Sequence, residues 1–134
     1  MNAERLERGV LWLTRLTLAA AFLSGIASRF GWYGPGVGYG DFAHFEQYTA
    51  EVNSFAPAWM IPFLAWAATV AEAGLGVALL VGRKLRVVAW ASAALLFVFG
   101  TAMAISFGIK EPLDYSVFSA AAAASLLAIN PKVS

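Results

Sequence analysis

The sequence predicts an all-α integral membrane protein with four transmembrane helices in an antiparallel bundle and one short amphipathic helix on the outer side. Hydrophobic residues make up 60% of the 134 residues and charged residues only 13%, against about 45–50% and 25% in soluble domains. The apolar residues gather in four runs, which we expect to span the bilayer over about 10–28, 59–82, 87–109 and 113–130. Basic residues concentrate on one side of this arrangement. A chain of this length is expected to form a single domain, 1–134.

The first apolar run, 10–28, follows a charged head and carries Arg15 about one and a half turns into the helix. A basic start and a small-residue end are also typical of a signal peptide. Because three further apolar runs follow, a retained first helix gives an even number of spans with a consistent charge distribution. We therefore expect this helix to be retained.

The longest polar interval separates the first and second apolar runs. Its first part, 31–40, is rich in glycine and aromatic residues, which indicates turns at the membrane interface. Asp41 can then cap a helix over about 41–53. Phe42, Phe45 and Tyr48 share one side of that helix, so we expect it to be amphipathic and to lie on the bundle or in the headgroup zone.

The second apolar run contains one carboxylate, Glu72, near its middle. A bilayer core takes about 20 helical residues, and a carboxylate at that depth is costly enough to suggest a function and a partner. Small residues flank Glu72 at helical spacing, whereas bulky residues occupy the opposite face, so we expect Glu72 to face protein. The face that we expect to be buried carries Ala65, Ala68, Glu72, Gly76 and Leu79.

Arg15 is the predicted partner of Glu72, because we place the two about 8 Å and 15 Å above the inner membrane boundary. One interpretation is a buried ion pair that fixes the register of the two helices. The other is that Glu72 handles protons beside a substrate, with its pKa tuned by Arg15 and by burial.

The distribution of basic residues predicts the orientation of the chain in the membrane. Seven basic residues fall on one side (Arg5, Arg8, Arg15, Arg83, Lys84, Arg86 and Lys132), and two fall on the other (Arg29 and Lys110). We expect a multi-pass protein of the plasma (inner) membrane with both termini in the cytoplasm. The fourth run carries a stripe of small residues, which predicts a helix packed inside the bundle.

Three stretches resemble the DoxX family of small four-helix membrane proteins. They are Arg15 with the segment 22–25, the segment 72–76 with 80–82, and the segment 112–119. The similarity covers nearly the whole chain, including the outer segment. This resemblance implies a four-helix transmembrane bundle and a relation to membrane subunits of thiosulfate:quinone oxidoreductases.

Polar and aromatic side chains are predicted to gather near the outer surface. A quinone headgroup requires hydrogen-bond donors for its carbonyl oxygens, aromatic walls and a route for protons. Interfacial Trp and Tyr and a capping Asp are the structural alternative for the same residues. The candidate ligand-binding residues are His44, Tyr48, Asn53, Trp59, Asp114 and Tyr115, and we place Glu72 below this cluster.

The composition narrows the possible chemistry. The chain has no cysteine and one histidine, so we expect no iron–sulfur cluster, no haem and no metal site within it. A net charge of +1 gives no reason to expect nucleic acid as a partner. We expect the lipid bilayer as a partner, together with a quinone or other lipid-soluble ligand and a soluble or membrane partner subunit.

Two functions remain open at this point, and whether the protein is an enzyme is also open. The first is a quinone-interacting subunit of a membrane oxidoreductase, which would need a bound cofactor or a partner. The second is a non-catalytic membrane scaffold or small-molecule or lipid binder that docks a partner protein.

Overall fold

The computed structural model describes residues 2–134 and is helical throughout, without a β-strand in that range. The elements are α1 (Ala3–Arg29), α2 (Phe42–Val52), the 3-10 turn η1 (Ala58–Met60), α3 (Ile61–Val81), α4 (Leu85–Phe107), α5 (Lys110–Asp114) and α6 (Val117–Ile129). The all-helical prediction is confirmed.

Three helical segments are long and apolar enough to cross a membrane: Ala3–Arg29, Ala58–Val81 and Leu85–Phe107. The single helix expected over 113–130 is not formed, because Ser116 adopts a left-handed backbone with φ 57° and separates α5 from α6. The 13 residues of α6 extend only about 20 Å, less than the roughly 30 Å of a hydrocarbon core. The chain is therefore a multi-pass membrane protein, and a fourth complete span is not clearly formed.

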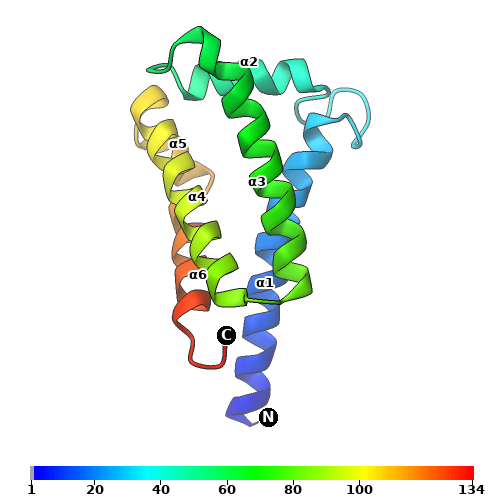
Figure 1. The fold of residues 1–134 in the computed structure, drawn as a ribbon, viewed down its shortest axis with the longest axis vertical. Coiled ribbons are helices and arrows are strands. Elements are labelled where there is room, and N and C mark those ends of the chain that lie inside the picture. The colour runs from blue at the N-terminus through cyan, green and yellow to red at the C-terminus, as the bar shows by residue number, and fades with distance from the viewer. Residues whose placement is uncertain (1) are drawn as a thin grey trace.

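The helix predicted over about 41–53 is formed and is α2. Asp41 precedes it in an extended conformation, and its carboxylate accepts a hydrogen bond from the backbone N–H of His44 at 2.8 Å. This side chain satisfies one of the N–H groups that a helix start leaves free. In Figure 1, α2 lies across the end of the bundle that is opposite to both termini.

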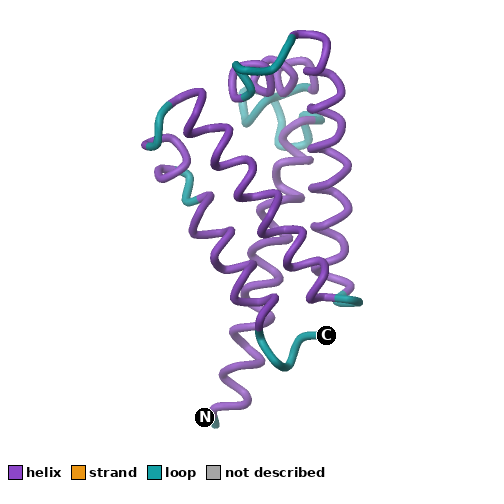
Figure 2. Tube along the Cα trace, turned by 60° about the vertical axis from the view of Figure 1, so that its left-hand side comes forward, coloured by secondary structure: helices purple, strands orange, loops and turns teal. Residues whose placement is uncertain are grey.

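The helices are arranged as two pairs. The most extensive contacts join α1 to α3 and α4 to α6, whereas α3 and α4 meet much less. A tight turn connects α3 and α4 at the end where the termini lie, and the two helices diverge from that turn toward α2 (Figures 1 and 2). The bundle is thus closed at one end and splayed at the other.

The main hydrophobic core fills the closed end. It includes Phe22 of α1, Leu79 of α3, Ala89 of α4 and Leu127 of α6, all of which are buried. Alanine contributes many of its members, so these helices approach closely and leave little space between them. The splayed end lacks such a core, and this difference positions the site described below.

The predicted burial of one α3 face is confirmed except at Ala68, which is half-buried and lines a cavity. Its buried residues are Ile61, Ala65, Thr69, Glu72, Gly76 and Leu79. Gly76 permits close approach to α1, because a β-carbon at that position would lie 2.9 Å from the side chain of Leu23. The bulky residues Trp66 and Val70 lie on the exposed face, as predicted.

Candidate functional site

A cavity of about 700 Å³ lies between the splayed helices. Its walls come from α3 and α4, and α2 covers it at the end opposite to both termini. Small residues on α3 create much of the space, namely Ala67, Ala68 and Ala71, while larger apolar residues of α4 line the opposite wall, among them Leu95, Phe99 and Met103. The volume falls in the range of about 300–1,000 Å³ that is typical of small-molecule sites.

Glu72 reaches this cavity from α3 and forms a salt bridge with Arg29 at the end of α1. Only 4% of Arg29 and 7% of Glu72 is exposed. A second guanidinium nitrogen, Nη1, donates to Thr69 Oγ1 at 3.2 Å, and the guanidinium carbon lies 3.8 Å from the centre of the Phe45 ring. Because a lone buried charge is very costly, each of these two charges requires the other.

The predicted pairing of Glu72 with Arg15 is wrong. Arg15 instead donates from Nε to the carbonyl of Leu79 at 2.8 Å and from Nη2 to that of Leu80 at 2.9 Å. Those carbonyls belong to the last turn of α3, which lacks intrahelical donors and carries partial negative charge. Arg15 is therefore level with the C-terminal end of α3, about two turns from Glu72.

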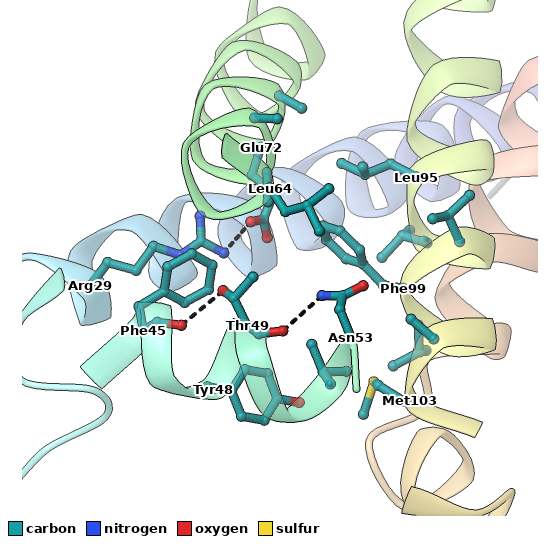
Figure 3. Close-up of a pocket in the computed structure, with 18 of the residues that line it drawn as sticks. Arg29, Phe45, Tyr48, Thr49, Asn53, Leu64, Glu72, Leu95, Phe99 and Met103 are labelled. Carbon is teal, nitrogen blue, oxygen red and sulfur yellow. Dashed lines mark hydrogen bonds and ion pairs between the residues drawn. The ribbon is translucent and has the colours of Figure 1, made fainter. Parts of the chain in front are cut away.

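Residues of α2 form the side of the cavity that lies farthest from the termini. Thr49 is buried and donates its hydroxyl proton to the carbonyl of Phe45 at 2.8 Å. Asn53, at the end of the helix, donates from Nδ2 to the carbonyl of Thr49 at 2.9 Å. In Figure 3, Glu72 points from α3 toward α2, and Thr49 and Asn53 point toward it. The polar groups therefore meet at one end of an otherwise apolar space.

Two tyrosines stand beside this polar end. Tyr39 from the glycine-rich segment and Tyr48 from α2 have ring centres 5.5 Å apart, and both line the cavity. Burial is the main cause that raises the pKa of Tyr39 and of Tyr48 above that of free tyrosine. The neighbouring Tyr48 raises the pKa of Tyr39 further and Arg29 lowers it, while Glu111 raises that of Tyr48. Both phenols therefore remain neutral and keep their protons at physiological pH.

The structure separates the six ligand-binding candidates into two groups. Tyr48, Asn53 and Tyr115 line the cavity. The other three lie on the surface: His44 pairs with Asp41, Asp114 pairs with Lys110, and Trp59 is 78% exposed. Glu72, which we placed below this cluster, lines the same cavity as Tyr48 and Asn53.

Sequence reasoning missed Arg29, which we had assigned to the outer loop. A signal for its burial is present: Arg29 continues the inward stripe of α1 formed by Leu18, Phe22 and Ile26 at helical spacing. It also missed Thr49 and Thr69 as polar members of the site. Within residues 2–134, no group of three or more His, Cys, Asp or Glu side chains could hold a metal ion.

The family of the chain follows from a match to a family model. The model described as methylamine utilisation protein MauE matches residues 7–115, which is more than half of the chain and covers most of α1 and all of α2 to α5. No curated protein and no solved structure matches. This finding overturns the resemblance to the DoxX family, whose loose motifs had suggested a different family of membrane proteins. The chain belongs to the MauE family of methylamine utilisation proteins.

Proposed function

We propose that this protein serves methylamine utilisation as a membrane-embedded binder of a lipid-soluble small molecule. The observation that carries the proposal is the cavity between α3 and α4, an apolar space of about 700 Å³ with polar groups gathered at one end. An isoprenoid quinone, whose polar ring is joined to an apolar tail, is the first candidate ligand. The protein would then act with a partner that supplies or removes electrons.

The cavity is accessible from the bilayer. Two residues in its wall, Val98 and Tyr115, are 60% and 68% exposed, so the space reaches the molecular surface beside them. Val98 lies near the middle of α4, a candidate membrane span. An opening at that depth faces hydrocarbon, which suits a ligand that is dissolved in the membrane.

Methylamine itself is a poor fit for this cavity. A simple amine is a small cation at neutral pH, as the lysine side chain is, and it needs an uncompensated negative charge. The single carboxylate of the site, Glu72, is already neutralised by Arg29. We therefore place the protein in methylamine utilisation through a different ligand.

The fold supports a fourth passage through the membrane within the same proposal. Although α6 is short, α5 precedes it, and together they extend from Lys110 to Ile129. A passage that bends at Ser116 and packs against α4 would return the chain to the side of the N-terminus.

The test is the composition of the purified protein. We expect a lipid-soluble compound, identified by absorbance and mass, to co-purify with the wild type. Ala71→Phe should abolish it, because the ring would occupy the cavity. The matched control is Val70→Phe, which adds the same ring on the exposed face of α3 and should retain the compound. An empty wild-type cavity together with a co-purifying soluble protein would contradict this proposal and favour a non-catalytic scaffold.

A further inference from the structure

The polar end of the cavity contains an acceptor that no donor of the protein satisfies, and it belongs to Glu72. Its Oε2 atom is taken by Arg29, whereas no donor within residues 2–134 bonds to Oε1. Oε1 retains some exposed surface. Within residues 2–134, the side-chain polar atom that is fully buried without a hydrogen bond is Arg29 Nε, and Oε1, which also has no hydrogen bond, does not share that full burial. A β-carbon on Gly25 would lie 3.5 Å from Oε1, so the glycine leaves room around this oxygen.

The α2 side of the cavity adds a second free acceptor. Asn53 uses Nδ2 to donate to Thr49, and its Oδ1 receives no hydrogen bond from residues 2–134. The hydroxyl proton of Thr49 is committed to the carbonyl of Phe45. A carboxylate oxygen and an amide oxygen thus remain open as acceptors, and the hydroxyls of Tyr39 and Tyr48 line the same cavity without a hydrogen bond within residues 2–134.

The net charge of the pair also limits what can bind. The opposite charges of Arg29 and Glu72 cancel, so a full charge on a ligand adds little binding energy. A carboxylate oxygen nevertheless accepts stronger hydrogen bonds than a neutral oxygen does. A hydroxyl can donate to this oxygen and also accept from a tyrosine hydroxyl, whereas a carbonyl or ether oxygen can only accept. An uncharged head group with a hydroxyl therefore complements the site better than one that offers only carbonyl or ether oxygens.

We propose that the ligand is an amphiphile with a hydroxyl-bearing, uncharged aromatic head group of the phenol or quinol type, which donates a hydrogen bond to Glu72 Oε1. This inference rests on the proposed function, since it assumes that the cavity takes a lipid-soluble ligand. For a quinone carrier, it means that the reduced form, which has hydroxyl groups, binds more tightly than the oxidised form, which has carbonyls.

The test compares two probes, para-hexylphenol and its methyl ether, para-hexylanisole, in which one added methyl group removes the donor. Each is titrated in radiolabelled form against the full-length protein in lipid nanodiscs. We expect the phenol to bind the wild type about tenfold more tightly or better, as is typical of one hydrogen bond to a charged acceptor. In the same assay, the quinol form of a short-chain quinone should bind more tightly than its oxidised form.

Two variants assign the preference to the site. Glu72→Gln places an amide that can donate where the carboxylate accepts, so the preference for the phenol should vanish while the anisole still binds. Asn53→Ala removes the second acceptor without leaving Arg29 unpaired, and because the phenol has a single proton, which Glu72 accepts, this variant should keep the preference. The matched control is Glu51→Gln, an exposed carboxylate on α2 outside the cavity, which should keep the full preference.

The outcomes separate this inference from the proposed function. If the wild type binds both probes equally, or if Glu72→Gln keeps the full preference, the hydroxyl inference is overturned while ligand binding stands. If the wild type binds neither the probes nor the quinol and quinone, the proposed function itself fails.

Discussion

Arg29 and Glu72 determine the chemistry of the splayed end at the scale of single residues. The two come from different helices, and both are almost fully buried. Removing one partner of such a pair leaves a buried charge without compensation, which typically costs about 3–5 kcal/mol, whereas removing both can cost much less. The pair therefore fixes the contact of α1 with α3 without necessarily adding net stability.

We predict that Glu72→Leu and Arg29→Leu each lower the free energy of unfolding by about 3–5 kcal/mol. The double variant should lose clearly less than the sum of the two, because it leaves no unpaired charge. Glu72→Gln should cost less than Glu72→Leu, since an amide still accepts a hydrogen bond from Arg29. Denaturation of the purified protein in mild detergent, followed by tryptophan fluorescence, measures all four. Strict additivity would show that the two side chains do not interact energetically.

The sequence predicted that Glu72 is buried but not which arginine it contacts. Arg15 and Arg29 lie on the same face of α1, about four turns apart, so helical periodicity cannot choose between them. The choice depends on how α1 slides along α3. We aligned the first apolar residues of α1 with the end of α3, whereas the structure places Arg15 beside Gly82 and leaves the first turns of α1 beyond that end (Figure 1). Only tertiary packing fixes this offset.

At the scale of elements, α2 connects the two helix pairs. On one side, Phe42 stacks on Trp66 of α3 with ring centres 4.3 Å apart. On the other side, Ser106 of α4 donates to the carbonyl of Val52 at 2.7 Å and bonds to the hydroxyl of Ser54 at 2.9 Å. The helix that covers the cavity is therefore held to both of its walls.

We predict that the first turn of α2 loosens in acid through Asp41. Hydrogen bonds from the backbone N–H and then the ring of His44 hold the pKa of this carboxyl below its usual value. A lowered pKa in the folded state means that the stabilisation is fully present above the unfolded-state pKa of about 3.9 and is lost as the pH falls through the folded value. Hydrogen exchange at the first amides of α2, measured from neutral pH into acid, should show this loss. Asp41→Asn keeps a capping side chain that does not titrate, so an equal acid response in that variant would contradict the assignment.

The elements differ in how well the sequence specified them. The helix α2 was predictable because Asp41 caps it and its apolar residues follow helical spacing. The break between α5 and α6 was not, because Ser116 takes a left-handed backbone that serine rarely adopts. Nothing local demands that conformation, so it depends on how α5 and α6 pack against α4.

At the scale of the whole molecule, the fold combines a tightly packed end with an open one. Small residues close the end near the termini, whereas α3 and α4 diverge beneath α2 and enclose the cavity. The sequence predicted the helices and the buried face of α3 because periodicity and composition report burial. It could not predict the cavity, because the divergence of two helices is a property of their packing. For the same reason, the sequence could not separate the candidates that line the cavity from those outside it, which are His44, Trp59 and Asp114.

The two ends of the molecule also lead to a prediction of orientation. Both termini and the α3–α4 turn lie at one end, opposite α2 (Figure 1). Basic residues such as Arg83 and Arg86 gather at that end, and Arg29, which we had counted on the outer side, is buried in the bundle. The remaining charge asymmetry favours placing the closed end in the cytoplasm.

Because the chain contains no cysteine, single cysteines can be labelled without background. We predict that Glu51→Cys, on the exposed side of α2, reacts with a membrane-impermeant thiol reagent in intact cells. Arg83→Cys, in the α3–α4 turn, should react only after the cells are permeabilised. Both positions are exposed in the structure, so the difference reports the side of the membrane and not burial. Labelling of Arg83→Cys but not Glu51→Cys in intact cells would show the opposite orientation, with the cavity nearer the cytoplasm.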